Sequence, residues 1–170
     1  MNLKKYIYDV ENFPTKGILF RDITPLLNNG KAFSYVIDQM AEFANKVGAT
    51  KIASPEARGF IFGSALAYKL KLPHVLVRKP GKLPRETINE VYDLEYGTNE
   101  VGIHKDAIQK GDKVLIVDDL LATGGTVKAA ANLVERLEGE VVGLAFTIEL
   151  TGLNGKNKLE GYKLLSLVKY

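Results

Sequence analysis

Two patterns of apolar residues alternate along this chain, one with the spacing of a helix and one in short continuous runs. Helical spacing predicts amphipathic helices over residues 31–47 and 126–138, and a largely buried helix over residues 59–71. Gly48 is placed to end the first of these helices, because glycine readily adopts the conformation that closes a helix. Pro73 follows the buried helix closely and marks where that helix must stop.

The continuous apolar runs predict five strands. Their bounds are 50–54, 74–78, 112–118, 140–150 and 162–168. Strands that are apolar throughout are typical of a sheet covered on both faces. Because the strands alternate with helices, we expect an α/β fold in which a central parallel sheet is flanked by helices. The length of 170 residues suits a single domain over residues 1–170.

A polar stretch over residues 78–106 interrupts this alternation and is long for a connection between a strand and the next element. Residues 91–103 within it have the character of a hairpin, with Gly97, Thr98 and Asn99 at the turn. Long connections in compact domains are usually functional or mobile. We therefore expect a two-stranded flap, over about residues 80–105, that moves over a site.

Composition narrows the class of protein only modestly. A net charge of +3 does not predict nucleic-acid binding, and the absence of cysteine excludes disulfides and thiolate chemistry. No apolar run is long enough for a signal peptide or a membrane span. We expect a cytoplasmic protein.

The segment KVLIVDDLLATGGTV, residues 113–127, carries the clearest chemistry. Asp118 and Asp119 end a predicted strand, and open α/β sheets bind ligands at the carboxyl ends of their strands. The loop that follows leads into a helix, so its N–H groups and the hydroxyls of Thr123 and Thr126 can cradle a phosphate. Carboxylates repel phosphate but accept hydrogen bonds from sugar hydroxyls, directly or through a magnesium ion. The segment therefore predicts a site for a sugar phosphate.

Two common phosphate motifs are excluded. The P-loop needs four residues between its glycines and a lysine after them, whereas the glycines here are adjacent and no lysine follows. The Rossmann pattern G-x-G-x-x-G is also absent. An acidic pair or a glycine turn alone would indicate only a capped surface turn. Their ordered combination at one strand–loop–helix junction is far more specific.

The segment VLIVDDLLATGGT resembles the 5-phosphoribosyl-1-pyrophosphate motif of type I phosphoribosyltransferases. Four further segments are similar, in order and spacing, to the adenine phosphoribosyltransferase family: FPTKGILFRDITPLL (13–27), EARGFIFGSALA (56–67), VRKPGKLP (77–84) and LEYGTNEVGIHKDAI (94–108). The resemblance covers essentially the whole chain. It implies the type I phosphoribosyltransferase fold, with a small N-terminal hood over about residues 1–30. It also implies a glycosyltransferase of purine salvage that transfers phosphoribosyl to N9 of adenine, giving AMP and pyrophosphate.

The resemblance also implies which residues hold the sugar phosphate and the leaving group. The 5′-phosphate would be bound by one loop: Ala122, Thr123, Gly124, Gly125 and Thr126. Asp118 and Asp119 would meet the ribose hydroxyls. Pyrophosphate would be bound by basic residues: Arg58, Arg78, Lys79 and Lys82. The family's non-proline cis peptide would fall at Glu56–Ala57.

Adenine binding and catalysis are likewise implied. The base would be bound by Leu19, Phe20, Arg21 and Leu120, with Phe20 and Leu120 on opposite faces of the ring. Glu95 would act as acid/base near the purine N7, beside Tyr96 on the flap. Attack by N9 at C1′ builds positive charge on the sugar, which a carboxylate stabilises. Flap closure would exclude water from the activated sugar.

The family works with Mg²⁺, which would be held through the substrate and water with no direct protein ligand, and its members form homodimers. Two alternatives remain: a transferase for another purine such as guanine or xanthine, and a non-catalytic regulator that senses phosphoribosyl pyrophosphate. The segment GILFRD argues against the first, since base choice resides there in the family. The chain has no helix-turn-helix segment for the second. His74, which opens a strand, and His104, which begins a predicted helix, are interpreted as structural.

Overall fold

The computed structural model describes residues 1–94 and 96–170, and the chain divides into two compact units, residues 1–39 and 40–170. The first unit contains a 3-10 helix, η1 (Leu3–Tyr6), and the antiparallel strands β1 (Tyr8–Glu11) and β2 (Leu19–Asp22). The short helix α1 (Thr24–Leu27) follows, and then the first turns of α2 (Gly30–Val47). The predicted helix over residues 31–47 is confirmed, and Gly48 follows it with φ of +71°.

The second unit is built on a five-stranded sheet in the order β4-β3-β7-β8-β9, with every pair of neighbours parallel. Its strands are β3 (Lys51–Pro55), β4 (His74–Val77), β7 (Lys113–Leu121), β8 (Glu140–Glu149) and β9 (Leu164–Lys169). The predicted α/β fold with a central parallel sheet is therefore confirmed.

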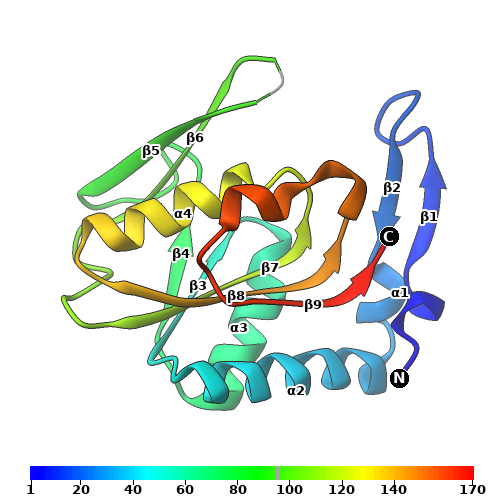
Figure 1. The fold of residues 1–170 in the computed structure, drawn as a ribbon, viewed down its shortest axis with the longest axis horizontal. Coiled ribbons are helices and arrows are strands. Elements are labelled where there is room, and N and C mark those ends of the chain that lie inside the picture. Colours follow the sequence, from blue (N-terminus) through cyan, green and yellow to red (C-terminus); the bar gives the residue numbers. More distant parts are fainter. Residues whose placement is uncertain (95) are drawn as a thin grey trace. The chain divides into compact units, whose positions relative to one another are not determined.

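Helices cover both faces of this sheet (Figure 1). One face packs on α4 (Gly125–Arg136), whose buried residues form a core with the sheet that includes Leu133, Ile116 and Phe146. The other face is covered by α3 (Arg58–Leu70) and by the part of α2 that belongs to this unit. Phe43 of α2 packs so closely there that a Cβ at Gly143 of β8 would lie 2.9 Å from its Cε1 atom.

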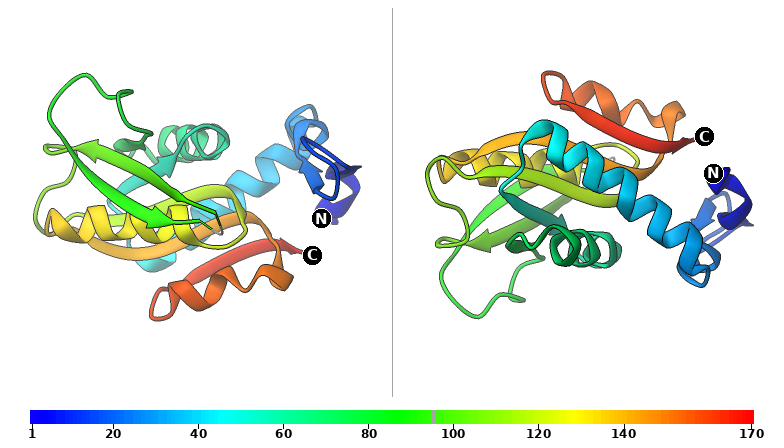
Figure 2. Two further views of the ribbon diagram at one scale, coloured as in Figure 1. Left: turned by 90° about the horizontal axis from the view of Figure 1, so that it is seen from above. Right: turned by 90° about the horizontal axis from the view of Figure 1, so that it is seen from below.

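The antiparallel strands β5 (Thr87–Asp93) and β6 (Thr98–His104) form the predicted hairpin. Figures 1 and 2 show it extended along α4. Its anchor lies at the carboxyl end of that helix, where Glu90 accepts hydrogen bonds from Asn132 Nδ2 at 3.0 Å and Arg136 Nη1 at 3.1 Å. Its turn lies earlier than predicted: Leu94 N donates to Gly97 O at 2.9 Å, and Thr98 and Asn99 already belong to β6.

Several other predicted boundaries differ from the structure. Strand β7 continues past Asp118 to Leu121, because its backbone keeps pairing with β8 as far as Glu149. Helix α3 ends at Leu70, before Pro73 is reached, because Lys71 turns to a left-handed φ of 55°. His104 begins no helix: it is the last residue of β6, paired with Thr87.

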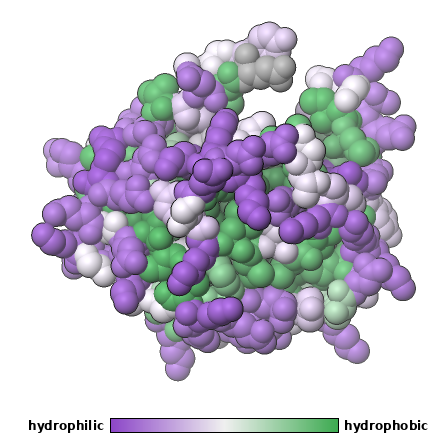
Figure 3. All heavy atoms as spheres, viewed as in Figure 1, coloured by the Kyte–Doolittle hydropathy of each residue, from purple (hydrophilic) through white to green (hydrophobic). Residues whose placement is uncertain are grey.

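The segment after β8 forms two short 3-10 helices, η2 (Thr151–Leu153) and η3 (Gly155–Leu159), before the chain returns to the sheet as β9. Figure 3 shows hydrophilic residues over α4 and apolar residues in the region of β8 and β9. Within residues 1–94 and 96–170, none of the helices has the length and apolar character needed to cross a membrane.

Candidate active site

The carboxyl end of β7 and the amino end of α4 meet at a short loop, residues 122–124. A glycine is needed in this loop at Gly124, whose φ is +80°. The cavity beside the loop has a volume of about 80 Å³ and is lined by Asp118, by Leu120 and by the predicted phosphate residues Ala122, Thr123, Gly124, Gly125 and Thr126. The structure therefore brings Asp118, one of the two predicted ribose residues, to the same cavity as the predicted phosphate residues.

A second glycine, Gly155 at the start of η3, supports this loop from outside the predicted motif. A Cβ at Gly124 would lie 2.5 Å from the Gly155 carbonyl oxygen. A Cβ at Gly155 would collide with the carbonyl oxygen of Ala122. The two segments can approach this closely only because both positions are glycine. Nothing in the spacing of the sequence links Gly155 to the loop, which lies about 30 residues earlier.

The two adjacent carboxylates have different surroundings. Asp119 is buried, and its Oδ2 atom lies 2.8 Å from Nη2 of Arg58 at the amino end of α3. Asp118 is half-buried, and its Oδ1 atom accepts a hydrogen bond of 2.8 Å from the Asp119 backbone N–H. Helix α3 approaches the pair so closely that a Cβ at Gly59 would lie 2.9 Å from Asp118 Oδ1. Predicted ribose and pyrophosphate residues are thus in direct contact through Arg58 and Asp119.

Burial raises the pKa of Asp118 well above its ordinary value, and the neighbouring charge of Asp119 raises it further. Burial also raises the pKa of Asp119, while the Arg58 guanidinium opposes that rise. Ionising both of two adjacent carboxylates is unfavourable where little water reaches them, because the two negative charges repel each other. Hydrogen-bond donors on a bound ligand, or a cation, would favour the doubly ionised form. The pair is therefore suited to accept from sugar hydroxyls.

The predicted pyrophosphate residues lie on two segments that contact each other. The Glu56–Ala57 peptide is cis, as expected. Glu56 Oε1 lies 3.3 Å from Arg78 Nε and accepts a hydrogen bond of 2.8 Å from Lys79 N. Arg78 Nη1 also donates to Lys82 O at 3.2 Å. Glu56 therefore joins the loop before α3 to the basic segment, a role that the sequence did not indicate.

Three of the four predicted adenine residues, Leu19, Phe20 and Arg21, lie on β2 in the first unit. Phe20 packs edge-on against Phe13, with ring centroids 5.0 Å apart and planes inclined at 70°. Arg21 is ion-paired with Asp9 on the neighbouring strand. The fourth residue, Leu120, lines the phosphate-loop cavity of the second unit. Their shared contact with a base stays a prediction.

The hairpin contacts the phosphate loop through a residue that the sequence did not single out. The hydroxyl oxygen of Tyr92, on β5, lies 2.8 Å from Thr126 Oγ1, and Asn99 Nδ2 donates to the same tyrosine oxygen at 3.1 Å. Glu95, the predicted catalytic residue, lies outside the described residues. Tyr96, beside it in sequence, is exposed.

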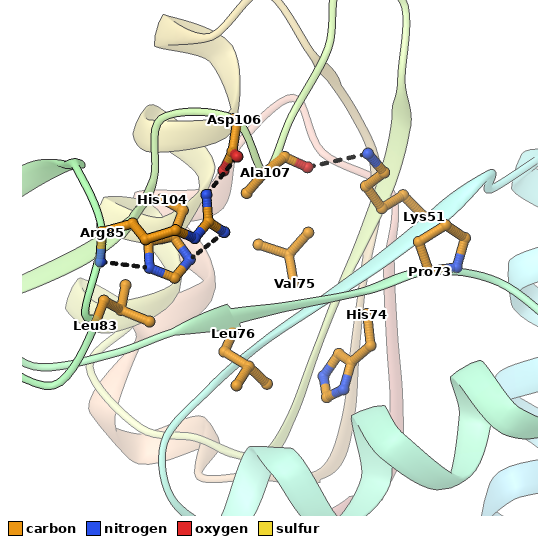
Figure 4. Close-up of a pocket in the computed structure, with 10 residues that line it drawn as sticks. All are labelled: Lys51, Pro73, His74, Val75, Leu76, Leu83, Arg85, His104, Asp106 and Ala107. Atoms are coloured by element: carbon orange, nitrogen blue, oxygen red, sulfur yellow. Dashed lines mark hydrogen bonds and ion pairs between the residues drawn. The ribbon is translucent and has the colours of Figure 1, made fainter.

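A larger cavity, of about 390 Å³, lies at the opposite edge of the sheet, where β3 and β4 begin (Figure 4). Its charged groups already have partners: Lys51 lies 2.6 Å from Asp112, and Arg85 is ion-paired with Asp106. The two histidines also lie here. His74 is hydrogen-bonded to Ser54, and burial lowers its pKa; His104 contacts Arg85. These contacts favour a structural role for this cavity over a catalytic one.

Comparison with known proteins finds relatives that match this chain over most of its length. The family model of the phosphoribosyl transferase domain matches residues 26–164. An adenine phosphoribosyltransferase of Clostridium botulinum is 59% identical over 170 residues, which are 100% of this chain and 99% of the relative. The crystal structure of adenine phosphoribosyltransferase from Thermoanaerobacter pseudethanolicus is 53% identical, with a TM-score of 0.96 over 99% of this chain and 98% of that one.

A third relative is more distant. The adenine phosphoribosyltransferase of Saccharomyces cerevisiae, solved with adenine and an imino-altritol bisphosphate, is 41% identical. Its TM-score is 0.90, and the match covers 97% of this chain and 96% of the yeast chain. The similarity to these proteins extends over nearly the whole chain, so it includes the sheet, the hairpin and the loop between β7 and α4. The chain belongs to the adenine phosphoribosyltransferase family.

Proposed function

We propose that this protein transfers the 5-phosphoribosyl group from 5-phosphoribosyl-1-pyrophosphate to N9 of adenine, giving AMP and pyrophosphate in purine salvage. One observation carries the proposal: the junction of β7 and α4 lines a single cavity with Asp118, Leu120 and the loop over residues 122–126. A phosphate needs N–H and hydroxyl donors, and ribose hydroxyls need acceptors. This junction supplies both.

The proposed roles follow the chemistry of each group. The loop over residues 122–126 binds the 5′-phosphate, and Asp118 and Asp119 accept from the ribose hydroxyls. Arg58, Arg78, Lys79 and Lys82 bind the pyrophosphate, which they hold by charge as it leaves. The side chains of Lys79 and Lys82 are exposed and have no ion pair among the described residues, which leaves their charges available to such an anion.

In the proposed reaction the bond between C1′ and the pyrophosphate oxygen breaks, and that oxygen keeps the electron pair. N9 of adenine forms the new bond to C1′ with its lone pair, and the ring proton leaves from N7 to the Glu95 carboxylate. We assign Glu95 as the acid/base that handles the proton at the purine N7, and Tyr96 as its neighbour on the flap. Positive charge develops on the ribose between these events, and nearby carboxylates stabilise it.

Phe20 and Leu120 are assigned to the faces of adenine. Backbone groups near Leu19 would read its amino edge by hydrogen bonds, and the Arg21 side chain would reach a ring nitrogen. Hydrogen bonds are needed for discrimination, because stacking alone accepts any purine. The yeast relative, solved with adenine bound, supports this choice of base.

The magnesium ion is proposed to arrive with phosphoribosyl pyrophosphate. Asp118 and Asp119 offer carboxylate oxygens, and Mg²⁺ commonly keeps several waters while binding one or two carboxylates and substrate phosphates. The residues present fit an ion held by the substrate phosphates and by waters from which Asp118 and Asp119 would accept hydrogen bonds, and the ion would neutralise charge on the pyrophosphate.

We also propose a cytoplasmic homodimer. The exposed apolar side chains Ile61 and Tyr68 of α3 and Leu76 of β4 support a contact between copies through this side of the second unit. Light scattering on the purified protein tests it: a monomer mass at micromolar concentration would contradict the dimer. The absence of cysteine fits a reducing compartment.

The function is tested by incubating the purified protein with Mg²⁺, phosphoribosyl pyrophosphate and one base at a time, and separating nucleotides by chromatography. Adenine should yield AMP and pyrophosphate in equal amounts. Turnover of guanine or xanthine without turnover of adenine would contradict the choice of base. Binding of phosphoribosyl pyrophosphate without turnover of any base would favour a sensor over an enzyme.

A further inference from the structure

The contact between the hairpin and the phosphate loop is a chain of three hydrogen-bonding side chains. Asn99 of β6 and Tyr92 of β5 are paired directly across the hairpin. Asn99 Nδ2 donates to the Tyr92 hydroxyl oxygen at 3.1 Å, and that oxygen lies 2.8 Å from Thr126 Oγ1 in the first turn of α4. The chain joins the hairpin to a residue proposed to bind the 5′-phosphate.

The first member of this chain favours one direction, in which Tyr92 donates to Thr126 Oγ1. Asn99 Oδ1 accepts a hydrogen bond of 3.0 Å from the Glu100 backbone N–H, so the amide nitrogen must be the atom that faces Tyr92. An amide nitrogen only donates, so the tyrosine oxygen accepts there and its single hydrogen is available for Thr126 Oγ1. The hydrogen of the Thr126 hydroxyl is then left for another acceptor.

The tyrosine ring is held close to the loop backbone as well. A Cβ at Gly125 would lie 3.0 Å from Tyr92 Cδ2, so the ring fits against this position because the residue there is glycine. The other anchors of the hairpin, from Asn132 and Arg136 to Glu90, lie toward the carboxyl end of α4. Tyr92 is therefore a contact of the hairpin at the amino end of α4, two residues before the turn that begins at Leu94.

We propose that Tyr92 is a positioning residue that orients the Thr126 hydroxyl toward the 5′-phosphate and thereby couples occupation of the phosphate loop to docking of the β5–β6 hairpin. The proposal rests on the proposed function only in taking residues 122–126 as the phosphate site. A phosphate that accepts from Thr126 strengthens the bond from Tyr92, because successive hydrogen bonds polarise one another. By linkage, a docked hairpin must favour phosphate binding to the same degree. The hairpin that carries Glu95 would thus dock most firmly when the sugar phosphate is present.

The test is Tyr92→Phe, which removes the hydroxyl and keeps the ring. Loss of one hydrogen bond to an oriented donor should weaken ribose 5-phosphate binding, measured by calorimetry, about fivefold to tenfold. The KM for phosphoribosyl pyrophosphate should rise similarly, while pyrophosphate binding should stay within twofold. A matched control is Tyr162→Phe, which removes a tyrosine hydroxyl that donates to Glu135 at 2.7 Å. The control should leave ribose 5-phosphate binding within twofold.

Hydrogen exchange provides the readout that a merely structural role would not move. Ribose 5-phosphate should slow exchange of the amides of residues 87–104 in the unaltered protein and in Tyr162→Phe, but not in Tyr92→Phe. The proposal is overturned if Tyr92→Phe binds ribose 5-phosphate within twofold of the unaltered protein, or if its hairpin is still protected by the ligand. Neither measurement needs turnover, so an inactive protein would contradict the proposed function and leave this test intact.

A second variant covers the case in which Tyr92→Phe does not fold. Asn99→Leu keeps a similar side-chain size but removes the donor to the Tyr92 oxygen, which favours donation from Tyr92 to Thr126. Tyr92 is then free to accept from Thr126, and ribose 5-phosphate binding should weaken about twofold to fivefold with loss of ligand-induced protection. Unchanged affinity and unchanged protection in this variant would overturn the proposal.

Discussion

Arg58 and Asp119 form an ion pair, with 2.8 Å between Nη2 and Oδ2, that joins the amino end of α3 to β7. Its two members differ in exposure, since the Asp119 side chain is 6% exposed and the Arg58 side chain 34%. A residue that can hold a leaving pyrophosphate therefore also compensates a buried carboxylate of the proposed ribose site. A change at Arg58 should therefore affect both the stability of the fold and the binding of pyrophosphate.

Replacing Arg58 should lower both stability and activity. In Arg58→Gln the buried Asp119 loses its cationic partner, which should cost about 1–3 kcal/mol of the free energy of unfolding at pH 7. The KM for phosphoribosyl pyrophosphate should rise. Urea unfolding measures the first effect and steady-state kinetics the second.

The control is Lys110→Gln, which breaks an exposed pair with Glu138 at 3.3 Å. It should change the free energy of unfolding by less than about 0.5 kcal/mol, as is usual for surface substitutions. Equal stability losses in the two variants would show that the Arg58–Asp119 pair has no special role in the fold.

Stability in the absence of ligand should fall as the pH rises above the ordinary carboxyl range. The pKa of Asp118 is raised in the folded protein by burial and by Asp119, so the folded state binds a proton that the unfolded state has lost. This contribution is fully present below the ordinary value of 3.8 and is lost as the pH rises through the raised folded value.

Asp118→Asn should remove that dependence. Its free energy of unfolding should exceed that of the unaltered protein at pH 7, by more than about 0.5 kcal/mol, and the difference should shrink near pH 4. Transfer activity should drop sharply, because an amide cannot replace the carboxylate charge. Chemical denaturation at the two pH values checks the first claim. The claim would be contradicted if the gain in the free energy of unfolding of Asp118→Asn over the unaltered protein were smaller at pH 7 than at pH 4.

The parallel sheet could be predicted because its signal is local. Each strand buries an apolar run, and the alternation with helices leaves few arrangements of the sheet. Predicted strand ends were wrong where polar residues follow an apolar run but the backbone continues to pair with the neighbouring strand. Asp118 and Asp119 look like the end of a strand, yet the backbone of β7 pairs with β8 as far as Leu121. The end of a strand is set by its partner, which a single segment does not reveal.

The contacts around the site could not be predicted for the same reason. The loop over residues 122–126 was recognised from consecutive residues. Tyr92 and Gly155 reach the site from distant segments, and Glu56 joins its own segment to Lys79, through contacts that the three-dimensional arrangement creates. Tyr92 carries no signal in its own segment beyond a place on a predicted hairpin. Sequence reasoning therefore found the groups proposed to touch the substrate and missed the groups that position them.

The support of the phosphate loop by Gly155 leads to another prediction. Gly155→Ala places a Cβ against the Ala122 carbonyl oxygen, so the loop must shift. Such overpacking should cost about 1–3 kcal/mol of stability. The KM for phosphoribosyl pyrophosphate should rise more than the KM for adenine, because the displaced backbone belongs to the proposed phosphate site. Kinetics and thermal unfolding measure the two effects.

A neighbouring glycine provides the control. A Cβ at Gly152, in η2, would meet nothing within 4 Å, so Gly152→Ala should leave the KM for phosphoribosyl pyrophosphate and the unfolding temperature nearly unchanged. If Gly155→Ala also left this KM and the unfolding temperature unchanged, the close approach of η3 to the loop would have no part in phosphate binding.

The basic segment after β4 should contribute charge to binding without contributing stability. Lys79 and Lys82 are exposed, and the described residues offer their side chains no ion pair, so Lys79→Ala with Lys82→Ala should leave the free energy of unfolding within about 0.5 kcal/mol. Each lysine is a point charge beside a polyanion, so pyrophosphate affinity should fall severalfold at low salt and less at 0.5 M salt, where screening is stronger. Calorimetry at the two salt concentrations checks this, with the exposed Lys163→Ala as the control. A loss in affinity that is independent of salt would contradict an electrostatic role for these lysines, because screening must weaken any interaction that exposed charges make with a bound anion.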